Sequence, residues 1–118
     1  GRLILLYSEG VGQGRITLPK LVKYACGNPA RVAGLYPKKG VIQPGADADV
    51  VVLDPAKEWT MTTGKMHGNA DYTCYEGMKI KGAVERVLLR GKTIVKDGAF
   101  TGARGDGQYL KRGKSVLV

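Results

Sequence analysis

The chain has 118 residues, of which 43% are apolar, so it can form one small domain with a core, and a wholly disordered chain is excluded. Lysine and arginine outnumber the acidic residues 19 to 10, for a formal net charge of +9. Such a charge attracts nucleic acid or anionic membranes where it is clustered. Here the basic residues occur as scattered singles and pairs, such as Lys38–Lys39 and Lys111–Arg112, which argues against a nucleic-acid partner.

The apolar runs and the cysteines bear on where the chain is located and whether its thiols are reduced. The first apolar run, LILLY, is too short to span a membrane, and no signal peptide is recognisable. Cys26 and Cys74 lack metal-ligand spacing, and we expect reduced, packed thiols. We therefore expect a cytoplasmic chain with no membrane partner. Its start, GRLILLYS, has no initiator Met and favours a piece of a longer polypeptide.

Helices are predicted in the first third of the chain. Residues 3–8 are apolar and compatible with a helix. Thr17 is a candidate N-cap for a second helix, which we expect to end at Gly27. Asn28 then caps a third, short helix that closes at Gly34. Because none of these helices can bury its apolar face alone, each is expected to pack on a larger body.

Strand patterns separated by turn signals follow. DVVVLDP, residues 49–55, is a continuous β-branched run, which predicts a strand buried on both faces. A separate strand is expected at 58–62. Residues 78–100 predict a hairpin with a tight turn at Arg90-Gly91-Lys92 and a second turn at Asp97-Gly98. The glycine-rich tail, 101–118, is expected to be mobile or docked on a partner. The predicted class is α+β.

The acidic stretch KGVIQPGADADVVVLDP allows two interpretations. Carboxylates such as Asp47 and Asp49 suit a hard divalent cation. However, strand alternation would place Asp54 on the opposite face from both, and an acidic residue entering a strand is commonly held by backbone N–H groups. The structural interpretation is favoured over a metal site.

No complete catalytic set is present in the residues themselves. His67 is the only histidine, so the chain cannot supply both a catalytic triad and a metal site. We assign no catalytic, cofactor-binding or metal-ligating residue in this chain.

Several stretches, in order, nevertheless resemble the end of the cyclic amidohydrolases of the hydantoinase and dihydropyrimidinase branch. They are GRITLPKLVKYACGNPAR, NPARVAGLYPKKGVIQPGADADVVVLDP, DYTCYEGMKIKG, VLLRGKTIVKDGAF and GDGQYLKR. The resemblance implies a (β/α)₈ barrel and a β-sandwich assembled from strands at both ends of the chain. Because such a barrel needs about 250 residues, residues 1–36 would be its last helices and residues 37–118 the C-terminal part of the sandwich with the tail.

The same resemblance gives the acidic stretch a structural role. Gly40, Ile42, Gly45, Asp47 and Asp49 match the family's turn into a sandwich strand. We expect Gly45 to adopt a backbone conformation that a side chain would oppose.

The resemblance also implies an activity for the parent protein. Members of the branch hydrolyse the ring amide of dihydropyrimidines or 5-substituted hydantoins to N-carbamoyl amino acids, with two divalent metal ions, usually zinc, that polarise the carbonyl and supply hydroxide. The metal ligands lie upstream of this chain, so the chain alone would be inactive. The implied partners are the remainder of the parent chain, a small cyclic amide, and further subunits of a tetramer, which the basic residues 111–114 could contact.

Two alternatives stay open. One is a non-catalytic, dihydropyrimidinase-like structural or interaction protein, which an upstream region without the metal ligands would indicate. The other is an independent basic binding module, for which binding to an anionic surface would depend steeply on salt.

Overall fold

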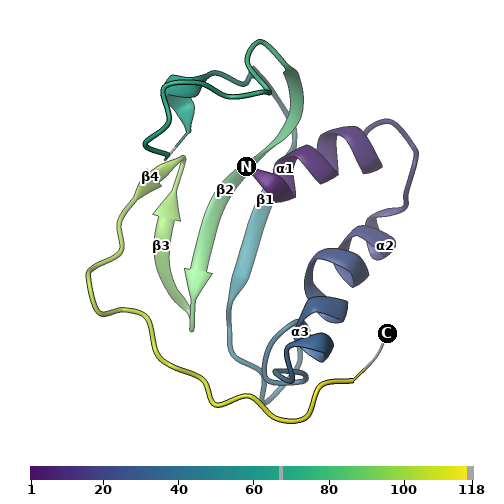
Figure 1. Ribbon diagram of the computed structural model, residues 1–118, viewed down its shortest axis with the longest axis vertical. Coiled ribbons are helices and arrows are strands. Elements are labelled where there is room, and N and C mark those ends of the chain that lie inside the picture. Colours follow the sequence, from purple (N-terminus) through teal and green to yellow (C-terminus); the bar gives the residue numbers. More distant parts are fainter. Residues whose placement is uncertain (67, 117–118) are drawn as a thin grey trace.

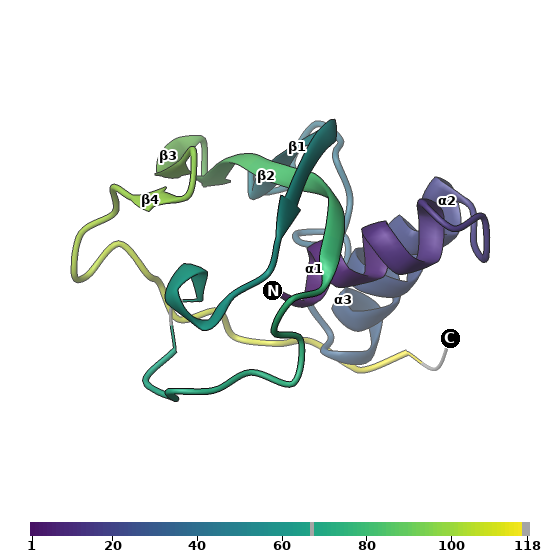
Figure 2. The ribbon, with the colours of Figure 1, turned by 90° about the horizontal axis from the view of Figure 1, so that it is seen from above.

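A computed structural model describes residues 1–66 and 68–116. It contains helices followed by a four-stranded antiparallel sheet in the order β1-β2-β3-β4. The helices lie beside the β1 side of the sheet, away from β4 (Figures 1 and 2). The predicted α+β class is therefore confirmed.

Each helix changes its hydrogen-bonding pattern along its length. α1 (Arg2–Leu5) continues without a break into the π-helical segment η1 (Leu6–Val11). The second helix runs through α2 (Leu18–Val22), the π-helical η2 (Lys23–Gly27) and α3 (Asn28–Val32). Its start was predicted correctly, because the N-cap hydroxyl accepts a hydrogen bond from a backbone N–H three residues later.

The predicted helix break at Gly27 and Asn28 is wrong. Both residues have right-handed helical backbone angles, with φ of −63° and −64°, and Asn28 makes no capping hydrogen bond with its side chain. Gly27 suggested the end of one helix, and Asn28 followed by Pro29 suggested the start of another, because proline has no N–H and its ring opposes the preceding α-helical turn. The wider π-helical turn of η2, directly before it, accommodates the proline without ending the helix.

The first strand, β1, spans Val50–Thr60, so the two strands predicted here are one. A bulge between Asp54 and Glu58 interrupts its register with β2. Asp54 Oδ1 accepts a hydrogen bond of 2.9 Å from the Ala56 N–H inside this bulge, where Pro55 does not disturb the ladder. The run that resembled a strand end is thus a bulge within a strand.

Burial of β1 on both faces is also wrong for the described structure. Val51 is 43% exposed and Val52, on the opposite face, is 39% exposed. β1 pairs only with β2 and is an edge strand of the sheet. Among the described residues, neither face of this strand is fully covered.

The hairpin turn lies where it was predicted but is one residue shorter, because Lys92 already begins β3 and pairs with Leu89. Arg90 and Gly91 have φ of +47° and +81°, as a two-residue type I′ turn requires. The same conformations recur at the next turn, at Asp97 and Gly98. The elements that complete the sheet region are η3 (Thr63–Lys65), β2 (Lys79–Leu89), β3 (Lys92–Lys96) and β4 (Ala99–Phe100).

The best-packed core lies where α1 meets the sheet. Ile4 is 6% exposed, Ile80 2% and Met61 0%. Beside them the buried hydroxyl of Ser8 accepts a 3.1 Å hydrogen bond from the backbone N–H of Lys81 in β2. This polar contact fixes η1 along the strand.

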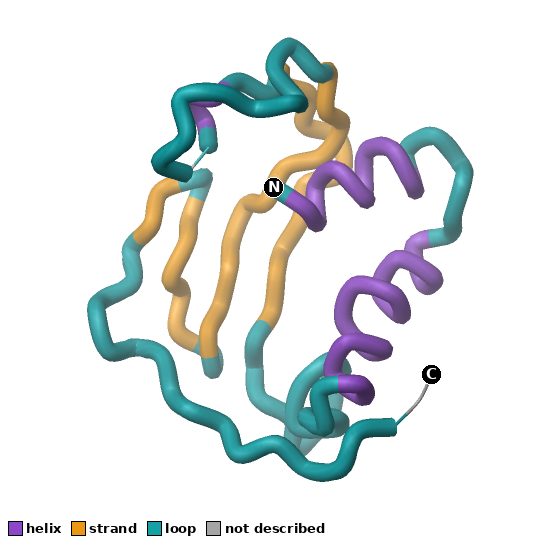
Figure 3. The backbone as a smooth tube through the Cα atoms, in the orientation of Figure 1, coloured by secondary structure: helices purple, strands orange, loops and turns teal. Residues whose placement is uncertain are grey.

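Long irregular segments connect these elements (Figure 3). Cys26 and Cys74 are both exposed, so the predicted packing of the thiols is wrong. Cys26 lies in η2 on the side that faces β1, and Cys74 lies in the turn before β2. Across the described ranges, no helix has the length and apolarity needed to cross a membrane.

The tail, expected to be mobile or docked on a partner, contacts the helices of its own chain. It returns from β4 to the α3 side of the molecule (Figures 1 and 2). The backbone N–H groups of Gly113 and Val116 donate to the carbonyls of Gly34 and Arg31, at 2.8 and 3.1 Å. The tail therefore docks on this chain's own helix end.

Candidate functional site

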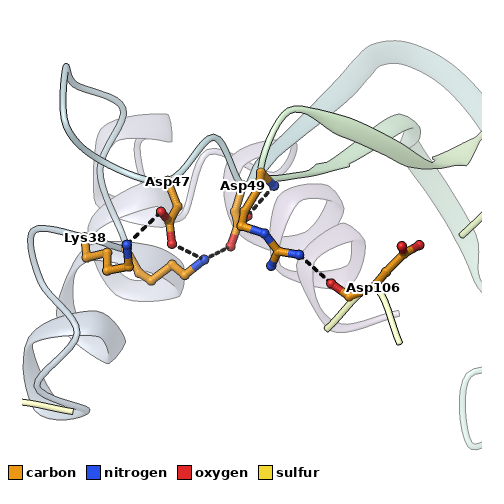
Figure 4. Close-up of polar contacts among 6 residues, drawn as sticks. Lys38, Asp47, Asp49 and Asp106 are labelled. Carbon is orange, nitrogen blue, oxygen red and sulfur yellow. Dashed lines mark hydrogen bonds and ion pairs between the residues drawn. The ribbon is translucent and has the colours of Figure 1, made fainter. Parts of the chain in front are cut away.

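The carboxylates of the acidic stretch form a network of charge pairs with the adjacent lysines Lys38 and Lys39 (Figure 4). Lys38 Nζ lies 3.1 Å from Asp47 Oδ1, and Lys39 Nζ lies 2.8 Å from Asp47 Oδ2. Lys39 also donates a hydrogen bond to Asp49 Oδ2. One ammonium group is thus shared by two carboxylates at the entrance to β1.

This network is joined to the β2–β3 turn. The backbone N–H of Arg90 donates to Asp49 Oδ1 at 2.8 Å, and that of Gly91 donates to the Ala48 carbonyl at 2.9 Å. The left-handed backbone of the type I′ turn directs these N–H groups toward Ala48 and Asp49, directly before β1. The interpretation that an acidic residue entering the strand would be held by backbone N–H groups is confirmed for Asp49.

Electrostatics keep the network charged. The pKa of Asp47 is lowered, first by the Lys39 ammonium and then by that of Lys38. Burial opposes ionisation of Asp49, but Lys39 and the Arg90 N–H outweigh it, so the pKa of Asp49 is also lowered. Burial likewise opposes the charge on Lys39, and its two carboxylate partners outweigh that, so the pKa of Lys39 is raised. All three groups are ionised over the physiological range.

The arrangement does not fit a metal ion. Both carboxylates already face ammonium groups, whose charge would repel a cation. Asp54 belongs to the bulge in β1 and bonds to its own backbone. Within residues 1–66 and 68–116, no group of three or more histidine, cysteine, aspartate or glutamate side chains could hold a metal ion. His67, weighed above as a catalytic group, lies outside the described residues.

Gly45 has the conformation expected of it. Its φ is +86°, in the left-handed region, and no other atom lies within 4 Å of where a Cβ would project. Backbone geometry alone therefore favours glycine here. The turn it makes brings the Asp47 N–H within 2.9 Å of the Lys38 carbonyl and closes the loop that carries the charge pairs.

An apolar groove of about 700 Å³ lies next to the charged network. Its helical wall includes Leu21, Val22 and Ala30, and its strand wall includes Val51 and Leu53. Lys39 and Asp49, paired with each other, also line it. Among the described residues that line it, the other polar side chains are those of Tyr7 and Cys26, which do not form a catalytic set, so the groove can receive an apolar surface but offers no chemistry.

Sequence reasoning singled out the acidic stretch but missed its partners. The adjacent lysines 38 and 39 were treated as scattered charge, and Arg90 only as a turn residue. The available signal was a Lys-Lys pair eight to ten residues before an Asp-x-Asp pair, with turn residues between them. The groove had no sequence signal beyond the apolar helix face.

Known proteins match this chain over nearly its whole length. The model of the amidohydrolase family matches residues 2–94. A D-hydantoinase from Rhizobium radiobacter is 47% identical over 113 residues, covering 96% of this chain and 24% of that protein. A D-phenylhydantoinase from Escherichia coli O1:K1 is 46% identical over 111 residues, covering 94% of this chain and 24% of that protein.

Solved structures agree. A crystal structure of D-hydantoinase from Bacillus sp. AR9 superposes with a TM-score of 0.94 at 43% identity, covering 98% of this chain and 25% of that one. The chain thus spans about a quarter of the length of the relatives it matches. Because the family model matches well over half of its residues, the chain belongs to the amidohydrolase family.

Proposed function

We propose that this chain is the C-terminal segment of a hydantoinase- or dihydropyrimidinase-type cyclic amidase. The parent protein would hydrolyse the ring amide of a 5-substituted hydantoin or a dihydropyrimidine to an N-carbamoyl amino acid. The observation that carries the proposal is the match over 96% of this chain to a D-hydantoinase at 47% identity. The fold agreement with a solved D-hydantoinase supports it independently of sequence identity.

Within that protein we assign residues 1–36 to the last barrel helices and residues 37–118 to the sandwich and tail. The division is supported by the end of α3 at Val32 and by the start of the sheet at Val50. The charge network lies between them and sets the direction in which the chain leaves the helices. The segment would therefore be a scaffold, while residues outside it carry the chemistry.

The remainder of the polypeptide is the partner that this scaffold implies. The groove beside α2 and the exposed faces of β1 are apolar surfaces of the kind that another part of a protein covers. Val22, at 52% exposed, and Val51, at 43%, belong to both the groove and this exposed set. Assembly into a tetramer and a cytoplasmic location complete the proposal.

The metal pair of the proposed enzyme would be bound outside this chain. Two divalent ions, zinc in our proposal, would polarise the ring carbonyl and supply the hydroxide. The carboxylates of Asp47 and Asp49 are held by lysines and do not fit such ions. No step of the reaction is assigned to residues of this chain, and the isolated segment is expected to be inactive.

The intact mass of the polypeptide in its source cells tests the proposal, using an antibody raised against this sequence. A product several-fold heavier than 12.6 kDa is expected. The purified product should contain a divalent metal and open a hydantoin or dihydropyrimidine ring. A heavy product with neither metal nor ring opening would instead support the non-catalytic relative. A free 12.6 kDa product would overturn the assignment to a longer enzyme.

A further inference from the structure

The tail is anchored to the sheet at Asp106. Its carboxylate accepts hydrogen bonds from Lys92 Nζ, at 2.9 and 3.1 Å, and from the Ala103 N–H at 2.7 Å. The guanidinium of Arg90 donates to the Asp106 carbonyl oxygen. Arg90 belongs to the β2–β3 turn and Lys92 directly follows it, so this anchor holds the tail to the same turn that holds Asp49 (Figure 4).

A second anchor fastens the tail to the end of α3. The last carbonyls of a helix lack partners within the helix. Here the Gly113 and Val116 N–H groups donate to the carbonyls of Gly34 and Arg31. The approach is close, because a Cβ on Gly34, whose φ is +68°, would lie 2.2 Å from the Gly113 carbonyl oxygen. The contact is therefore specific to a glycine at this position.

The two anchors belong to opposite walls of the apolar groove. Asp49, bound to the Arg90 N–H, lines the groove on the strand side, and Ala30 of α3 lines it on the helix side. The tail passes from the β4 side to the α3 side and so connects both walls (Figures 1 and 2). Among the described elements α3 makes no extensive direct contact with a strand, because the groove lies between them.

We propose that residues 103–116 form a strap that ties α3 to the sheet and limits opening of the groove, with a sheet-side anchor that salt releases. The sheet-side anchor depends on two charged side chains, Arg90 and Lys92, and the Lys92 side chain in its charge pair with Asp106 is 57% exposed. Exposed charge pairs are weakened by salt, whereas backbone hydrogen bonds respond much less. The helix-side anchor is of the second kind and would persist after the first has been released.

Hydrogen exchange on the full polypeptide that carries this sequence tests the strap. The amides to follow are those of residues 33–36, which close the end of α3. Asp106→Asn removes the carboxylate charge, and Asp97→Asn, in a turn on the same sheet, is the matched control because asparagine also tolerates its positive φ. Each protein is measured at about 0.02 M and about 1 M salt.

The strap predicts a definite pattern. At low salt, the amides of residues 33–36 should exchange roughly three- to tenfold faster in Asp106→Asn than in the wild type. Raising the salt concentration should change the exchange rate of Asp106→Asn little. The wild type and Asp97→Asn should both approach the Asp106→Asn rate at high salt. Unchanged exchange in Asp106→Asn, or the same salt response in all three proteins, would overturn the proposal.

A second variant covers the case in which Asp106→Asn alone does not release the tail. Termination after Gly102 removes the whole strap, and exchange at residues 33–36 should then be at least as fast as in Asp106→Asn. Amides of the β2–β3 pairing report whether the sheet stays folded. If the sheet remains protected and the α3 amides do not accelerate, the tail does not restrain α3.

Discussion

The two ends of the helix–sheet contact are built differently. At the α1 end, Ile4, Met61 and Ile80 are almost completely buried against one another, and Ser8 bonds to β2. At the α2–α3 end a groove separates the layers, and Val51 beside it is 43% exposed. The first end is joined by packing, and the second by charge pairs and the tail.

The two ends differ in how far the residues of this chain suffice to form a core. Close packing needs only the residues that are present, so the α1 end has a core of its own. Charge pairs at a partly exposed site fix direction and spacing more than they add free energy. We therefore expect stability to be uneven, with the α2–α3 end opening before the α1 end.

The largest expected effect is a core truncation at the packed end. Ile80→Ala should lower the free energy of unfolding by about 2–5 kcal/mol, because it leaves a cavity among fully buried neighbours. Val51→Ala, at the open end, should cost less than about 1 kcal/mol in the same chain. Urea unfolding of both variants measures the contrast, and equal losses would show that the two ends do not differ.

Alanine substitutions at two glycines compare a closely packed position with an open one. Gly82 and Gly45 have φ of +98° and +86°, so alanine strains the backbone at both, by about 1–2 kcal/mol. At Gly82 a Cβ would also lie 2.7 Å from the Tyr7 ring, while at Gly45 it meets open space. Gly82→Ala should therefore destabilise the chain by about 1–3 kcal/mol more than Gly45→Ala. Denaturation midpoints that coincide would contradict close packing of η1 on β2.

Local signals were sufficient for much of this fold. The Thr17 cap, the left-handed turn at Arg90-Gly91 and the conformation of Gly45 each depend on residues within a few positions of one another. Such features follow from backbone sterics and short-range hydrogen bonds. They could be predicted before any tertiary contact was known.

Features that depend on distant residues could not be predicted in this way. The Asp49 carboxylate accepts a hydrogen bond from the Arg90 N–H, 41 residues away, and no local sequence pattern at either residue predicts this contact. The bulge that makes β1 one strand depends on pairing with β2, and the exposure of Val51 depends on how far α2 lies from it. Tertiary structure sets the outcome in each case, and local propensity does not.

A helix-cap substitution should have a moderate effect at the open end. Thr17→Ala removes the hydroxyl that accepts from the Lys20 N–H and should cost about 1 kcal/mol. Thr17→Ser keeps that acceptor and should stay close to the wild type. Thermal unfolding followed by circular dichroism compares them, and an alanine variant as stable as the serine variant would show that the cap adds nothing.

The smallest effect concerns pH and the charge network. Because the pKa of Asp49 is lowered in the folded chain by Lys39 and the Arg90 N–H, against the opposing effect of burial, its ionised form favours folding. This contribution is complete above the ordinary pKa of 3.8 and is lost as pH falls through the lower, folded value. For Lys39, whose folded pKa is raised, the contribution is lost instead as pH rises above 10.5.

Asp49→Asn should consequently flatten the acid side of the stability profile. Urea unfolding of the wild type between about pH 5 and pH 2 should show a decline that is shallower in Asp49→Asn. Asp97→Asn, which removes a carboxylate outside the network, controls for the change in net charge and should decline like the wild type. Parallel curves for the wild type and Asp49→Asn would mean that the charge pairs at the entrance to β1 orient the chain without stabilising it. The open end would then depend on the tail and on the surfaces that cover the groove.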